Sequence, residues 1–161
     1  MATDPRTLKR LAERGVHYCR QGDWDTGMAC LARVAEADAG GAELPSLFYS
    51  YLGFGIAYRE RRVREGIELC RRACHLSFYE PENFVNLART CLLAGNRGEA
   101  YRAIERGYAL DPEEPALSKL HAKLGVRRAP VLRFLERRHP INRLLGRFRH
   151  GLTRASAAAA A

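Results

Sequence analysis

The sequence predicts an all-α fold built from repeated pairs of antiparallel helices. Apolar residues recur every three or four positions, as on one face of an α-helix, and Phe84, Leu87 and Cys91 give the clearest example. Turn signals such as Gly95-Asn96 interrupt this spacing at regular intervals. Small residues also recur at a nearly constant distance along the chain. Together these observations indicate a stack of similar helical units.

The distance between equivalent small residues sets the period of the repeat. Ala122 lies 34 positions after Ala88, and Ala100 lies 34 positions after Gly66. Small side chains at such positions let two helices approach to about 8–10 Å, and the larger residues around them fill the remaining space. About three such units are the minimum for a stable stack, because each buries its apolar face only against its neighbours.

The order of large and small residues identifies the kind of repeat. In the clearest copy the repeated positions hold Phe84, Leu87, Ala88, Cys91, Ala100, Ile104, Gly107 and Pro112. This order resembles the tetratricopeptide-repeat (TPR) signature, with Cys91 in place of the usual aromatic residue. The resemblance covers residues 8–124 and implies a right-handed superhelix. The implied parts of this domain (1–125) are helix pairs at about 8–37, 48–80 and 81–112, and a capping helix at 113–124.

Proline and aspartate mark two predicted helix starts. Asp4-Pro5 and Asp111-Pro112 each place a side-chain acceptor at the N-cap and a proline at the first helical position. The Gly22-Asp23-Trp24 segment falls at the turn within the first pair, where we expect the tryptophan to pack and the acidic residues to have a structural role.

The TPR resemblance also implies a binding groove. In TPR folds the first helix of each pair lines a concave surface, and five of its positions usually point into the groove. Here these positions are largely apolar, although Arg20 and Glu82 also fall among them. The residues expected to contact a protein ligand are Val16, Cys19, Tyr49, Leu52, Ile56, Val85, Arg89 and Leu92.

The composition of this groove predicts the kind of ligand. TPR domains that grip a terminal carboxylate use Lys and Asn at two fixed positions, which Ala12 and Val16 occupy here. We therefore expect an adaptor that binds an apolar peptide or helix. Two alternatives stay open: the groove residues are core or are covered by the chain's own tail, or the protein is similar to the TPR chaperones of type III secretion.

The basic charge of the chain is concentrated at its C-terminal end. Residues 126–161 hold nine Arg and one Glu, whereas residues 1–125 hold 18 Lys and Arg and 17 Asp and Glu. Apolar and basic residues alternate at helical spacing, which predicts a basic amphipathic helix within 126–154. Residues 155–161 are expected to be disordered. The predicted contact residues of this tail are Phe134, Arg143, Leu144, Leu145, Arg147 and Phe148.

The surface that supports the tail stays open at the level of sequence. The candidates are the chain's own repeats, a separate protein, an anionic membrane and nucleic acid. Gly146 and Gly151 weaken the helix by about 1 kcal/mol each, so the tail needs a surface to fold against. Docking on the chain's own repeats is the favoured interpretation.

The sequence contains no recognisable catalytic or metal-binding motif. Its five cysteines lie in apolar stretches, and Cys70 and Cys74 are interpreted as packing residues on one helix face. No Gly-rich phosphate loop or nucleophile elbow is present. We therefore expect a protein without enzymatic activity, cofactor or metal. The absence of a signal sequence and of a long apolar run predicts a cytoplasmic location.

Overall fold

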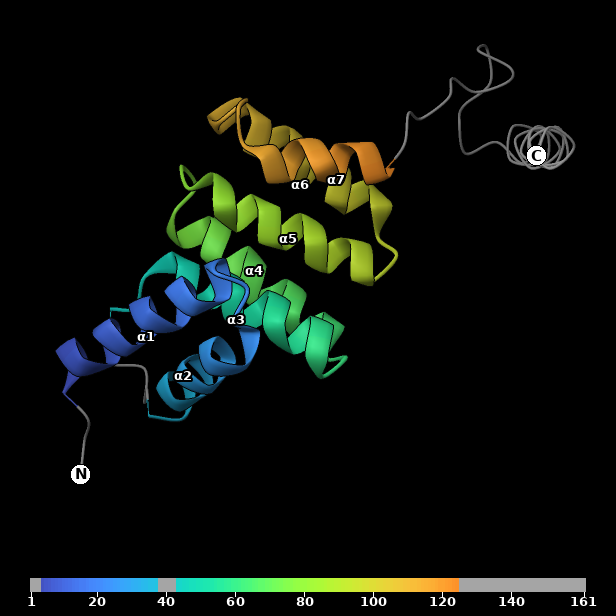
Figure 1. The fold of residues 1–161 in the computed structure, drawn as a ribbon. Helices are drawn as coiled ribbons and strands as arrows, with labels where there is room; N and C mark the ends of the chain where they lie inside the picture. The colour runs from blue at the N-terminus through green and yellow to red at the C-terminus, as the bar shows by residue number, and fades with distance from the viewer. Residues whose placement is uncertain (1–3, 38–42, 125–161) are drawn as a thin grey trace, which may run out of the picture. The chain divides into compact units, whose positions relative to one another are not determined.

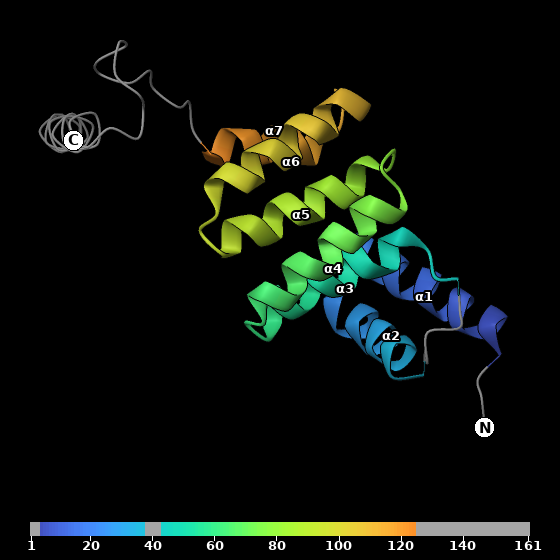
Figure 2. The same cartoon turned by 180° about the vertical axis from the view of Figure 1, so that it is seen from behind.

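The computed structural model describes residues 4–37 and 43–124 and contains seven α-helices in these ranges (Figure 1). The helices are α1 (Pro5–Arg20), α2 (Trp24–Ala37), α3 (Ser46–Arg59), α4 (Val63–Leu76), α5 (Pro81–Leu93), α6 (Arg97–Leu110) and α7 (Pro115–Leu124). The first six form three consecutive pairs, and α7 packs on α5 and α6, as the reverse view also shows (Figure 2). The predicted all-α fold with three helix pairs and a capping helix is confirmed for these residues.

Two helices begin at side chains that cap their first turn. The Asp4 carboxylate accepts a hydrogen bond from the Thr7 backbone N–H at 3.3 Å, and Pro5 opens α1 as the sequence predicts. At α6 the Asn96 side chain accepts from the backbone N–H of Glu99 at 3.2 Å. The same Asn96 amide donates to the Glu99 carboxylate at 2.8 Å, so both its oxygen and its nitrogen are hydrogen-bonded to Glu99.

The predicted N-cap of the capping helix is wrong, and the predicted range 113–124 begins two residues too early. Asp111-Pro112 does not cap a helix, because α7 begins only at Pro115. The Asp111 carboxylate instead accepts a hydrogen bond from the Glu113 backbone N–H at 3.0 Å, which stabilises a turn. A proline disfavours helical backbone at the residue before it, so Glu114 cannot continue a helix that starts at Pro112.

Small residues allow the helices of each pair to approach closely. A Cβ atom added at Gly53 would lie 2.7 Å from the carbonyl oxygen of Gly66, so α3 and α4 touch through their backbones. The large partners predicted for the third pair are in the core, since Phe84 and Ile104 are buried. Packing of small against large residues therefore holds the pairs together, as the repeat pattern predicts.

Candidate functional site

A pocket of about 350 Å³ lies on the face formed by the first helices of the pairs. We call it the first-helix pocket. It is lined by residues of α1, the α1–α2 turn, the start of α2, α3, α5, and the turn before α7 together with the first residues of α7. The residues that matter for its chemistry are Cys19, Arg20, Tyr51, Glu82, Val85 and Arg89.

One carboxylate joins three helices in the first-helix pocket. Arg20 in α1 donates from Nε to the two Glu82 oxygens at 3.1 and 3.0 Å, and the Tyr51 hydroxyl in α3 donates to the same group. The hydrogen bond to Glu82 raises the pKa of Arg20 above its ordinary value. Burial, then the Glu82 carboxylate, raises the pKa of the Tyr51 hydroxyl. Both donors therefore stay protonated at neutral pH.

Aromatic residues and a second arginine form another wall of the pocket. The Trp24 ring packs on Tyr51 and, edge to face, on Phe54, with centroids 5.9 and 5.3 Å apart. The Arg89 guanidinium carbon lies 5.6 Å from the centre of the Phe54 ring. Arg89 also donates to the Asn86 side-chain oxygen at 3.3 Å. The packing role predicted for Trp24 is confirmed, and Arg89 is held by contacts on two sides.

The structure brings three of the eight predicted groove residues together in the first-helix pocket. These three are Cys19, Val85 and Arg89. Cys19 and Val85 are themselves only 3% and 2% exposed, so Arg89 is the most accessible of the three. The others lie elsewhere on the first helices: four are buried in the described core, and one on α5 is half-buried. The buried residues are Val16, Tyr49, Leu52 and Ile56, and the half-buried residue is Leu92.

Five pocket residues fell outside the predicted groove positions: Gly22, Trp24, Tyr51, Glu114 and Ala116. Tyr51 occupies a repeat position expected to be core, yet it lines the pocket and its hydroxyl donates to Glu82. A buried tyrosine needs a hydrogen-bond partner for its hydroxyl, which is the signal that could have identified it. Glu114 precedes α7 and was not expected near the groove, because the repeat pattern does not place the α6–α7 turn against the first helices.

The predicted contact residues of the tail, Phe134, Arg143, Leu144, Leu145, Arg147 and Phe148, lie outside the described residues. The alternatives for the tail therefore remain predictions from the sequence.

Three of the five cysteines, Cys19, Cys70 and Cys91, are buried in the core, and Cys30 and Cys74 are half-buried. Cys70 is fully buried, and its thiol lies 3.5 Å from the Ser50 carbonyl oxygen, so the predicted packing role of Cys70 is confirmed. Burial raises the pKa of the Cys70 and Cys74 thiols to about 12. Within residues 4–37 and 43–124, no three His, Cys, Asp or Glu side chains converge as metal ligands. In the same ranges, no helix is both long and apolar enough to cross a bilayer.

Comparisons with known proteins identify the fold. No family model and no curated protein matches the chain. The structure of the first TPR of Spaghetti (RPAP3) bound to the HSP90 peptide SRMEEVD is similar with a TM-score of 0.58 and 18% identity, over 77% of this chain and 94% of that one. The first TPR domain of the human RPAP3 protein gives 0.59 and 18%, over 75% and 91%. The chain therefore has the TPR fold, as its repeat signature predicts.

Proposed function

We propose that this chain is a non-catalytic cytoplasmic adaptor that binds an apolar peptide or helix of another protein on the concave face of its TPR fold. The observation that carries the proposal is the first-helix pocket, in which Cys19, Val85 and Arg89 converge with the Arg20–Glu82 pair. A helical-repeat stack offers such a face to extended or helical ligands. The similar structure of Spaghetti holds a bound peptide, which supports a peptide ligand here.

One face of α5 extends the proposed contact surface beyond the pocket. Glu82, Val85, Arg89 and Leu92 follow one another at spacings of three and four residues, so they lie in one row along the helix. Leu92 is half-buried. Val85 is only 2% exposed, so a ligand lying along this row contacts Arg89 and Leu92 and reaches Val85 only within the pocket.

The polar groups of the pocket suit the backbone of the ligand. Arg20 and Glu82 are paired with each other, so within the cavity Arg89 supplies N–H donors to a ligand and Glu114 supplies a carboxylate acceptor. An extended peptide carries both donors and acceptors on its backbone, so it can meet groups of both kinds while its apolar side chain contacts Val85. Net charge on the ligand is not required by this arrangement.

The pocket differs from a site for a terminal carboxylate. Ala12 and Val16, at the two positions where such a site has Lys and Asn, are buried and carry no side-chain donor. We therefore expect SRMEEVD, the peptide bound to Spaghetti, to compete poorly with an apolar ligand of this chain.

The test is a selection of peptides from a random display library on the full chain, followed by fluorescence anisotropy with the selected peptides. We expect apolar sequences, and binding about fivefold or more weaker to Arg89→Ala, since the substitution removes a charged donor from the pocket. The control is Arg64→Ala at an exposed position of α4 outside both pockets, which should bind as the unsubstituted chain does. Equal affinity for Arg89→Ala, or displacement by SRMEEVD, would contradict the proposal. Circular dichroism checks that each variant is folded.

A further inference from the structure

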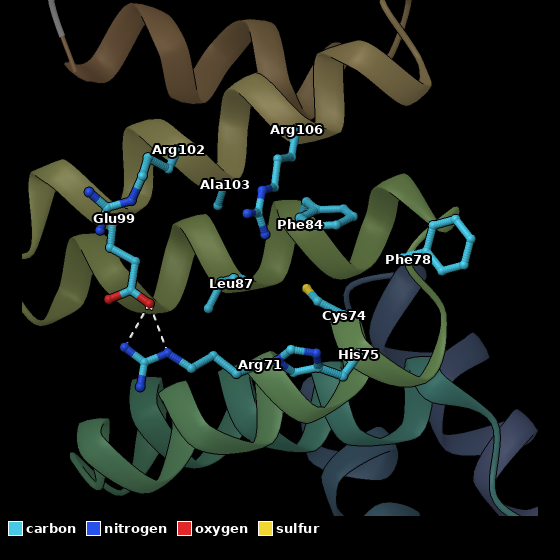
Figure 3. A pocket seen from close by; sticks show the side chains of 10 residues that line it. All are labelled: Arg71, Cys74, His75, Phe78, Phe84, Leu87, Glu99, Arg102, Ala103 and Arg106. Carbon is cyan, nitrogen blue, oxygen red and sulfur yellow. Dashed lines mark hydrogen bonds and ion pairs between the residues drawn. The ribbon is translucent and has the colours of Figure 1, made fainter.

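A second pocket lies between α4 and α6, the second helices of two neighbouring pairs, with α5 as its floor (Figure 3). We call it the second-helix pocket. Its volume is about 430 Å³, within the usual range of ligand sites. Leu87 lines it, whereas Val85 lines the first-helix pocket. At about 100° of rotation per helical residue, these two side chains point in roughly opposite directions from α5. The two pockets therefore lie on opposite sides of α5.

The second-helix pocket has an excess of positive charge. Arg71 on α4 is already paired, because it donates to Glu99 at 2.8 Å and to Glu68 at 2.6 Å. Arg102 and Arg106 on α6 also line the pocket, and neither has a hydrogen-bond or ion-pair partner in the part of the chain that the structure describes. Two guanidinium groups are therefore available to an incoming anion.

The two free arginines lie one helical turn apart and belong to the same pocket. Residues four apart on a helix have Cβ atoms about 5–6 Å apart, so one ligand can reach both. Figure 3 shows the Arg106 guanidinium extending from α6 toward Phe84, while the Arg71–Glu99 pair lies at the other end. Arg106 on α6 and Cys74 on α4 line the pocket from its two sides (Figure 3), and the positive charge of Arg106 opposes the rise that burial causes in the pKa of the Cys74 thiol.

The rest of the lining is apolar. Phe84 and Leu87 on α5 are buried and form part of the floor. Phe78, in the turn between α4 and α5, is 73% exposed at one end of the pocket and packs edge to face on Tyr79, which is also exposed. Leu76, Phe78 and Tyr79 are all exposed in this segment, and a contiguous exposed apolar patch is typical of an interaction site.

We propose that the second-helix pocket is a separate binding surface for an extended acidic segment of another protein that carries a large apolar side chain. The carboxylates of the segment pair with Arg102 and Arg106, since guanidinium groups bind carboxylates with two parallel hydrogen bonds. Its apolar side chain contacts Phe84 and Phe78. Charge complementarity selects this occupant.

The same charges disfavour two other occupants. The tail of this chain holds nine Arg and one Glu in residues 126–161, so it repels the pocket. Nucleic acid binding requires several phosphates to be neutralised along a strand, whereas the described pocket offers two unpaired guanidinium groups above an apolar floor. A short acidic peptide matches both the number of charges and the floor.

The experiment uses the full chain and a fluorescein-labelled peptide with one Phe between two acidic stretches of Asp and Glu. A twin peptide has Ser in place of Phe. The test variant is Arg102→Gln/Arg106→Gln. The matched control is Arg6→Gln/Arg10→Gln, which removes the same charge at the same spacing from exposed positions on α1. Anisotropy gives Kd, and circular dichroism verifies folding.

We expect the peptide to bind the test variant about tenfold more weakly than the control variant, and the Ser twin to bind the unsubstituted chain several-fold more weakly than the Phe peptide. A similar loss in both double variants would overturn the proposal, because it would reflect net charge or the basic tail. Absence of binding to the unsubstituted chain would also overturn it. A labelled oligothymidylate provides the test for phosphate. If it binds the unsubstituted chain and loses as much affinity in the test variant as the peptide does, phosphate is the ligand and the proposal is overturned. Arg89→Ala should leave this binding unchanged, which separates it from the proposed function.

Discussion

Arg20 at the end of α1 donates hydrogen bonds to Glu82 at the start of α5, 62 residues further along the chain. Because the Tyr51 hydroxyl in α3 donates to the same carboxylate, Glu82 connects the first helices of all three pairs. The side chains of Arg20 and Glu82 are 47% and 22% exposed, so water partly screens the ion pair. The hydrogen bonds of Glu82 therefore link repeats that contact each other mainly through neighbours.

Replacing Glu82 by Gln should weaken the stack. The amide keeps the shape of the side chain but loses the charge-assisted hydrogen bonds to Arg20 and Tyr51, and we expect the free energy of unfolding to fall by about 1–2 kcal/mol. Urea unfolding followed by circular dichroism measures the change. Glu65→Gln is the control, because Glu65 pairs only with exposed Arg62 one helical turn away and should cost less than about 0.5 kcal/mol. Equal losses would show that Glu82 does not link the repeats.

Adding one methyl group between α3 and α4 should have a large effect. The Cβ atom of Gly53→Ala would lie 2.7 Å from the Gly66 carbonyl oxygen and 2.9 Å from Leu69 Cβ, so the helices must separate. We expect a loss of about 2–3 kcal/mol in unfolding free energy. Gly98→Ala in α6 is the matched control, because a Cβ atom added there would have no neighbouring side chain or helix within 4 Å. This substitution should stabilise the protein by about 0.5–1 kcal/mol. The melting temperature should fall in Gly53→Ala and rise in Gly98→Ala.

The fold could be predicted from the sequence because each repeat has a characteristic order of small and large residues over a short stretch of chain. The small residues at positions such as Gly66 and Ala100 show where helices approach, and Phe84 and Ile104 show what fills the space. The start of α7 was missed because the prediction considered Pro112 and not Pro115. Pro115 disfavours helical backbone at Glu114, so the helix begins after that residue.

The site was harder to predict from the sequence. Periodicity identifies the apolar face of a helix but not how closely neighbouring first helices pack, so Leu52 and Ile56 were expected in the groove and are buried. The pairing of Arg20 with Glu82 depends on the stacking of three repeats, and no local pattern specifies it. The sequence does not show that Arg102 and Arg106 are unpaired, because this depends on the ion pair that Arg71 forms with Glu99 in the folded chain.

A glycine in place of Arg61, in the turn between α3 and α4, should increase the stability of the fold. The corresponding turns of the other two pairs have Gly22 and Gly95 at φ of 88° and 70°, whereas Arg61 adopts φ of 61° here. A left-handed conformation costs a non-glycine residue about 1–2 kcal/mol, and glycine loses about 0.5–1 kcal/mol of that gain through backbone entropy. We therefore expect Arg61→Gly to raise the free energy of unfolding by about 0.5 kcal/mol in urea.

The control for this substitution is Arg64→Gly on an exposed position of α4, where the backbone is helical. Glycine there should lower the free energy of unfolding by about 1 kcal/mol, because no strain is relieved. If Arg61→Gly is as destabilising as Arg64→Gly, the left-handed conformation of Arg61 is not a source of strain.

Buried thiols should resist alkylation in the native protein. Burial raises the pKa of Cys19 from 9.0 to about 11 and that of Cys91 to about 12, and iodoacetamide reacts with the thiolate. A shift of two pKa units lowers the thiolate fraction about 100-fold, so at about pH 8 Cys19, Cys70 and Cys91 should react at least that much more slowly than in urea. Mass spectrometry of tryptic peptides measures each rate, with half-buried Cys30 as the internal reference.

The same shifts fix how stability responds to alkaline pH. The folded-state pKa of these thiols lies above the unfolded value of 9.0, so the unfolded chain releases protons first as pH rises. The thiols therefore stabilise the fold fully below about pH 9, and this contribution is lost progressively as the pH approaches about 11–12. Alkylation of Cys70 should accelerate over the same interval in which the melting temperature falls. Rapid alkylation of Cys70 at about pH 8 with an unchanged melting temperature would contradict the burial of its thiol between α3 and α5.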